Sequence, residues 1–193
     1  MNRAIGLWVL GILLLAGFDP ARAAGPADAV RSLPQAMQDK IAPDPAAFAR
    51  KLAFLAASYG ENGSLSAAAL DRMAATLRAR ARAAETARLM AADLDGDGAV
   101  SGDERRMALA ALSAPRQKRL EAAWAEADAD KDGQVSATEL AQQATTAGQR
   151  AMGPERLAEW KALMGLDADA DGQLTTAEIA AALALPTDKP PGG

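Results

Sequence analysis

Three twelve-residue stretches of the sequence carry aspartates at alternate positions, then a glycine, and a glutamate at the end. One of them is DLDGDGAVSGDE, from Asp93 to Glu104, and the others begin at Asp128 and Asp167. Four carboxylates in so short a segment repel one another unless a cation lies among them, and the ion is then the largest local charge. The spacing therefore predicts a divalent cation held by oxygen ligands.

Calcium suits this order of oxygen ligands. Ca²⁺ takes six to eight oxygens at roughly 2.3–2.6 Å, and a twelve-residue loop supplies them from side chains at places 1, 3 and 5, a carbonyl at 7, a water near 9 and a bidentate Glu at 12. The chain turns sharply at place 6, where glycine adopts a positive φ without a Cβ clash. Place 6 is Gly98, Gly133 or Gly172 in the three stretches. The sequence thus predicts three calcium sites.

Each stretch fills all six ligand places. The site nearest the N-terminus is assigned to Asp93, Asp95, Asp97, Ala99, Ser101 and Glu104. The next is assigned to Asp128, Asp130, Asp132, Gln134, Ser136 and Glu139. The last is assigned to Asp167, Asp169, Asp171, Gln173, Thr175 and Glu178. The place-7 residues contribute only a backbone carbonyl, and the place-9 hydroxyls hold the bridging water.

A fourth copy of the pattern precedes these three. One step of 35 residues, the spacing between Asp93 and Asp128, leads back from Asp93 to Ser58, where SYGENGSLSAAA runs to Ala69. Gly63 keeps the turn at place 6, but the carboxylates are missing. Because Ala69 stands where the bidentate Glu should be, we predict that this copy binds no calcium. The four copies are called loops 1 to 4 in chain order.

Apolar residues on both sides of each loop recur at helical spacing, so each copy is predicted to be a helix–loop–helix unit. Four residues before the loops lie Phe54, Leu89, Trp124 and Leu163, and one residue before them lie Ala57, Ala92, Ala127 and Leu166. We expect these side chains to face the core. Between Ser66 and Ala92 there is no helix breaker, so the helix after loop 1 can run into the helix before loop 2.

Composition favours an all-α protein and narrows the function classes. Half of the 193 residues are apolar, aromatics are only 4 %, and alanine, the strongest helix former, is abundant. The chain has no cysteine and no histidine, which excludes disulfides, Cys/His zinc sites, thiol nucleophiles and imidazole triads. With its clustered acids assigned to metal, we do not expect an enzyme. The net charge of −4 disfavours nucleic acid as a partner.

The N-terminus has the pattern of a secretory signal peptide. Arg3 precedes an apolar run, Ile5 to Phe18, and Ala21-Arg22-Ala23 supplies small residues at a cleavage site. We therefore expect residues 1–23 to be removed and the chain to be periplasmic or secreted in a bacterium, free of the membrane after cleavage. Retention as an uncleaved anchor is the alternative. Residues 186–193, rich in Pro and Gly, are expected to be disordered.

Residues 45 to 185 resemble the EF-hand superfamily, and within it the four-hand, calmodulin-like proteins. The resemblance implies an all-α fold in which hands one and two (45–113) form one lobe and hands three and four (114–185) the other, after an extension at 24–44. Short β-bridges would join the loops of a pair through the place-8 residues, which are Leu65, Val100, Val135 and Leu174.

Calcium binding leaves several roles open. The methionines are scattered and many groove positions are alanine, which favours a calcium buffer or a calcium-stabilised module over a sensor with a Met-rich groove. The alternative is a calcium-dependent regulator that binds a protein partner through its helical lobes. A lanthanide-binding role is less consistent, because place 2 holds Leu94, Ala129 and Ala168 where lanthanide-binding hands of this superfamily have proline.

Overall fold

The structure is a computed structural model that describes residues 26–184 of the chain. The predicted signal peptide (1–23) and tail (186–193) lie outside these residues. The described part is helical, with isolated β-bridges in place of a sheet, so the predicted all-α fold is confirmed. None of the helices described in this range is long and apolar enough to span a bilayer.

The elements follow the predicted helix–loop–helix order. Two short helices form the N-terminal extension, α1 (Pro26–Arg31) and α2 (Gln35–Ile41). The loops are then flanked by α3 (Pro45–Tyr59), α4 (Ala67–Met90), α5 (Gly102–Ala110), α6 (Ala114–Ala127), α7 (Ala137–Met152), α8 (Pro154–Lys161) with the 3₁₀ turn η1 (Ala162–Leu166), and α9 (Thr176–Ala182). Asp44 caps α3 by accepting a hydrogen bond from the Ala47 N–H at 2.8 Å, and Pro45 begins the helix.

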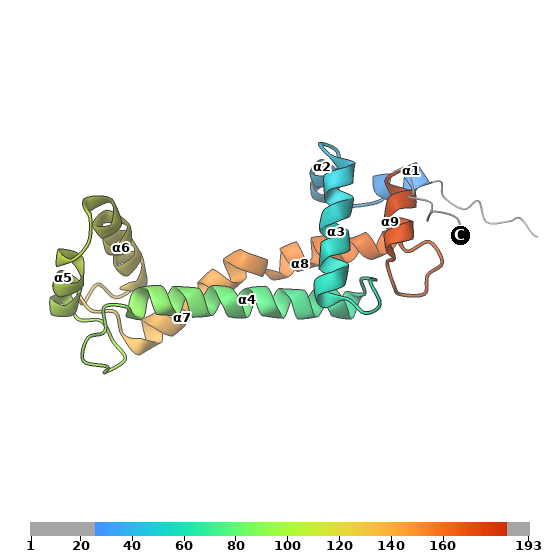
Figure 1. Cartoon of the computed structure of the whole chain (residues 1–193). Coiled ribbons are helices and arrows are strands. Elements are labelled where there is room, and N and C mark those ends of the chain that lie inside the picture. The colour runs from blue at the N-terminus through green and yellow to red at the C-terminus, as the bar shows by residue number, and fades with distance from the viewer. Residues whose placement is uncertain (1–25, 185–193) are drawn as a thin grey trace, which may run out of the picture.

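Helices α4 and α7 lie side by side between the two ends of the described structure (Figure 1). Helix α4 has 24 residues and is therefore about 36 Å long. Figure 1 shows α7 lying beside α4, with α5 and α6 at one end and α1, α2, α3 and α9 at the other. At the crossing, Gly148 of α7 is buried, and a Cβ there would lie 3.3 Å from the backbone oxygen of Arg78. The glycine therefore lets the two helices approach closely.

The loops pair differently from the prediction. Loop 1 pairs with loop 4, through Leu65 N–H to Leu174 O at 2.9 Å and the reciprocal bond at 2.6 Å. Loop 2 pairs with loop 3, through two bonds of 2.9 Å between Val100 and Val135. The expected pairing of hand one with two and three with four was wrong. Its physical reason is the unbroken α4, which holds loops 1 and 2 at opposite ends.

Each pair of hands has its own core. The terminal lobe, built from hands one and four, buries Phe48, Leu70, Trp160 and Ile179 together with three residues of the extension. Those three, Leu33, Met37 and Ile41, are at most 4 % exposed. The central lobe, built from hands two and three, has a smaller core: Leu89, Ala92, Val100, Ala123, Trp124, Ala127, Val135 and Leu140. The segments 45–113 and 114–185 therefore do not correspond to the two lobes.

Hand one also departs from the expected register. Leu89, Trp124 and Leu163 are buried as predicted, but Phe54 is 68 % exposed and Ala57 is exposed too. Leu52 and Ala56 face the core in their place. The reason is that α3 continues to Tyr59, past the first place of loop 1. The residues of α3 that face the core therefore lie at different distances from the loop than in the other three hands.

Candidate metal centre

A capping box begins the helix after each of loops 2, 3 and 4. In loop 2 the Ser101 hydroxyl accepts from the Glu104 N–H, and Glu104 Oε2 accepts from the Ser101 N–H at 2.8 Å. Ser136 with Glu139 and Thr175 with Glu178 form the same box. The place-9 residues, predicted to hold water, thus also fix the backbone at the point where the place-12 glutamate turns back towards the loop.

Three carboxylates converge in each acidic loop, from places 1, 3 and 12. The clusters, whose ligand oxygens lie within 4.8 Å of one another, are Asp93, Asp95 and Glu104; Asp128, Asp130 and Glu139; and Asp167, Asp169 and Glu178. The place-5 aspartates are not among them. Asp97, Asp132 and Asp171 instead accept from the place-7 backbone N–H at 2.7–2.8 Å. Their role as ligands therefore stays a prediction.

The backbone of the acidic loops turns at two places. At place 6, Gly98, Gly133 and Gly172 have φ values of 86°, 89° and 81°. Their N–H groups donate to the place-1 aspartates at 3.1, 3.2 and 2.8 Å. Place 4 also has positive φ, 77° at Gly96, 62° at Lys131 and 58° at Ala170. Sequence reasoning missed this second turn, because lysine and alanine do not indicate left-handed backbone.

The place-12 glutamates are ionised and ready to bind a cation. Hydrogen bonds from the Ser101 backbone and hydroxyl and from the Leu94 N–H lower the pKa of Glu104 to about 2. The pKa of Glu139 falls to about 2 through the corresponding bonds from Ser136 and Ala129. Burial acts to raise the pKa of Glu178, but hydrogen bonds from Thr175 and Ala168 outweigh it and the net shift is downward. A metal therefore displaces no proton from these groups at neutral pH.

Two observations indicate that the clusters fit a cation. Asp128 Oδ1 and Asp167 Oδ1 are buried without a hydrogen-bond partner, a costly state for a carboxylate oxygen. The pKa of Asp169 is raised: the Asp171 N–H acts to lower it, but burial and the negative charges of Asp171 and Glu178 prevail. A divalent ion would satisfy the orphaned oxygens and cancel this repulsion. All donors are oxygens, which are the ligands that a hard cation prefers.

The bridges between loops orient another ligand group. A peptide unit is planar and trans, so its C=O points opposite to the N–H of the next residue. The Val100 N–H points to Val135 O, which directs the Ala99 carbonyl away from loop 3, and the Val135 N–H does the same for Gln134. The guanidinium of Arg105 adds a hydrogen bond to the Gly133 carbonyl, so it also joins these two loops. Pairing thus directs each place-7 carbonyl away from the partner loop and towards its own loop, as the calcium prediction requires.

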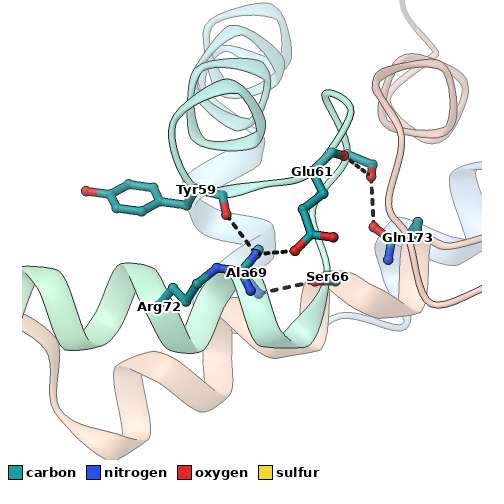
Figure 2. Close-up of polar contacts among 7 residues, drawn as sticks. Tyr59, Glu61, Ser66, Ala69, Arg72 and Gln173 are labelled. Carbon is teal, nitrogen blue, oxygen red and sulfur yellow. Dashed lines mark hydrogen bonds and ion pairs between the residues drawn. The ribbon is translucent and has the colours of Figure 1, made fainter.

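Loop 1 is closed by protein contacts. Asn62 and Gly63 have φ values of 52° and 76°, and Glu61 and Ser64 form a bridge around them, as in a tight Asn-Gly hairpin turn. Figure 2 shows Arg72 reaching back into the loop, where it donates to Tyr59 O at 3.1 Å and Glu61 Oε1 at 3.2 Å.

The end of loop 1 offers no carboxylate. Ala69, at place 12, is fully buried in the terminal core, and its N–H donates to the Ser66 hydroxyl at 3.2 Å. No acidic cluster of the kind seen in the other three loops occurs here among the described residues. The arrangement is consistent with the prediction that hand one binds no calcium, which stays a prediction.

Two segments of the chain match the sequence model of a family described as EF hand. The matches cover residues 87–104 and 125–142, which include loops 2 and 3 with parts of their flanking helices. Loop 4 lies outside both segments but has the same acidic cluster. Comparisons with curated proteins and with solved structures gave no match for this chain. The matched segments and the helical architecture together show helix–loop–helix units of the EF-hand type.

Proposed function

We propose that this chain, built from EF-hand units, is an exported calcium-binding protein with one ion in each of loops 2, 3 and 4. The observation that carries the proposal is that carboxylates converge in three separate loops. In two of these clusters an aspartate oxygen is buried without a hydrogen-bond partner. Bound calcium would neutralise each cluster and fix the loop between its two helices. Export rests on the N-terminal pattern, and extracellular sites of this kind bind at roughly 10⁻⁴–10⁻³ M.

Within this function, a buffer or calcium-stabilised module fits best. The terminal lobe buries Leu33, Met37 and Ile41 of its own chain in its core, so apolar surface of this lobe is already covered by the N-terminal extension. A module that calcium stabilises needs no exposed groove, and its role is binding rather than catalysis.

The central lobe favours the second candidate, a calcium-dependent regulator. It exposes Met107 by 56 % and has only partly buried apolar side chains at Met90, Leu109 and Leu120. Flexible apolar side chains of this kind are suited to contact with a protein partner. A protein that is retained on the immobilised chain with calcium and released by chelator would support the regulator.

Calorimetry tests the proposed function directly. Titration of the chain lacking residues 1–23 with calcium is expected to give three ions per molecule, because three loops have a complete set of ligands. Parallel titrations with magnesium and a lanthanide measure selectivity, since hard oxygen sites accept other hard cations. Uptake of fewer than two calcium ions at millimolar concentration would overturn the proposal.

Trp124 is expected to report calcium binding in the central lobe. Its ring is 1 % exposed, and its Nε1 donates to Leu89 O at 3.3 Å, which links the helices that precede loops 2 and 3. Ordering of either loop should therefore change the environment of this ring. Emission of a Trp160→Phe variant is expected to change on calcium addition and to return with chelator. A constant signal during calorimetric saturation would contradict coupling between the loops and these helices.

A further inference from the structure

Protein contacts hold loop 1 in a closed form. Besides the contacts of Arg72, Gly60 lies so close to the other side of the loop that a Cβ would fall 1.9 Å from Ser64 O and 2.5 Å from Ala56 O. The Gly60 N–H donates to Ala56 O at 2.9 Å, continuing the hydrogen bonding of α3 into the loop. The Asn-Gly turn, the arginine and the close backbone approach thus hold one closed form.

This closed loop contacts the part of loop 4 that is predicted to bind the ion through its backbone. The Leu174 N–H donates to Leu65 O at 2.6 Å, and the same peptide plane carries the Gln173 carbonyl at place 7. The Ser64 hydroxyl also donates to Gln173 Oε1 at 2.8 Å. Whatever fixes loop 1 therefore fixes the direction of the Gln173 carbonyl.

The central lobe lacks such a fixed partner. There, loops 2 and 3 both carry acidic clusters, so each loop relieves its repulsion only when its own ion binds. In the terminal lobe the partner of the acidic loop has no clustered carboxylates and is already closed by Arg72, which donates to Tyr59 O and Glu61. The cost of ordering the partner loop is met before any ion arrives, and preorganisation of this kind raises affinity.

We propose that loop 1 is an ion-free brace for the calcium site of loop 4, with Arg72 as a positioning residue whose guanidinium closes the brace as an ion closes the other loops. The inference rests on the proposed function, because it needs calcium at loop 4. It gives the degenerate hand a role, since the site of loop 4 then depends on residues of loop 1 that never touch its ion.

The test isolates the loop 4 site. In a Glu104→Gln/Glu139→Gln background, calorimetry reports this site alone. Gly60→Ala is expected to weaken its calcium affinity about tenfold, as is typical when a ligand loses its supporting contacts. Arg72→Ala is expected to weaken it about two- to fivefold, because the ion pair with Glu61 is exposed. Arg72→Lys, which keeps the charge but not the planar fork, should lie between Arg72→Ala and the parent.

Matched controls separate positioning from general damage. Arg80→Ala removes an exposed arginine from the same helix, and we expect it to leave the affinity unchanged. In a Glu178→Gln background, which leaves loops 2 and 3 active, Gly60→Ala and Arg72→Ala should have no effect on calcium binding. If circular dichroism shows that Gly60→Ala does not fold, the calcium affinities of the two Arg72 variants still test the proposal.

The outcomes distinguish the brace from the function itself. No calcium uptake in the Glu104→Gln/Glu139→Gln background would mean that loop 4 is not a site, and the proposed function would lose its third ion. Normal uptake with unchanged affinity in Arg72→Ala and in folded Gly60→Ala would overturn the brace and leave the function standing. Equal weakening by Arg80→Ala would also overturn it, because the effect would then not come from contacts within loop 1.

Discussion

Replacement of Glu104, Glu139 and Glu178 by glutamine is expected to abolish calorimetric calcium binding at millimolar calcium. Each substitution removes a charged, bidentate oxygen ligand and presents an amide NH₂ to the ion instead. Loss of an outer-shell partner alone costs 10–100-fold in metal affinity, so loss of this direct ligand should cost more than about 100-fold at each site.

The same triple variant should fold normally without calcium. Glutamine can replace glutamate in a capping box, so the helices after loops 2, 3 and 4 keep their N-terminal hydrogen bonds. The metal-free circular dichroism spectrum should therefore match the parent. Glu121→Gln, an exposed change on α6, is the matched control and should leave three ions bound. A triple variant with the parental titration would show that the glutamates have been wrongly assigned as ligands.

Gly148→Leu is expected to destabilise the contact between α4 and α7. A Cβ at this position already lies 3.2 Å from the Arg82 Cγ and 3.3 Å from the Arg78 backbone oxygen. The Arg82 side chain can move aside, but the backbone of Arg78 cannot do so without shifting α4. Overpacking of this kind typically costs about 1–3 kcal/mol in the free energy of unfolding.

Urea unfolding without calcium measures the effect of Gly148→Leu, as a lower transition midpoint with little change in slope. Ala141→Leu, an exposed substitution on the same helix, adds a similar side chain without meeting α4 and should keep the parental midpoint. Equal midpoints for the two variants would show that the contact between α4 and α7 contributes little to stability.

The acidic loops were the most predictable part of this protein. Spacing alone indicated which carboxylates should meet, and those at places 1, 3 and 12 do converge. The helix–loop–helix order also followed from the apolar spacing on both sides of each loop. These features are local, since each depends on residues close together in the chain, and the pairing of loops is not local.

The unbroken stretch after Ser66 was visible in the sequence, and its length conflicts with pairing of loops 1 and 2. The resemblance to four-hand proteins nevertheless favoured pairing of neighbours. A helix of about 36 Å decides the question, because loops at its two ends cannot touch. The length of the uninterrupted helix was therefore a better guide to the pairing of the hands than the resemblance.

Hand one was the least predictable part. The spacing of the four copies predicted that Phe54 faces the core. That prediction requires the helix before loop 1 to end where the corresponding helices of the other hands end. Arg72 lies outside the twelve-residue pattern, so nothing in the sequence singled it out as a residue that closes loop 1. Both features become evident only when the path of the chain from Tyr59 to Ser64 is known.

The joining of the first hand to the last determines the order in which the molecule can be assembled. The central lobe draws on a continuous stretch from Leu89 to Leu140, so a nascent chain can complete it early. The terminal lobe joins Leu33 to Ile179 and Leu65 to Leu174, so it can close only when the whole span between these residues is present. Contacts so distant in sequence form slowly, because a long loop has to be closed. The terminal lobe is therefore expected to close after the central lobe.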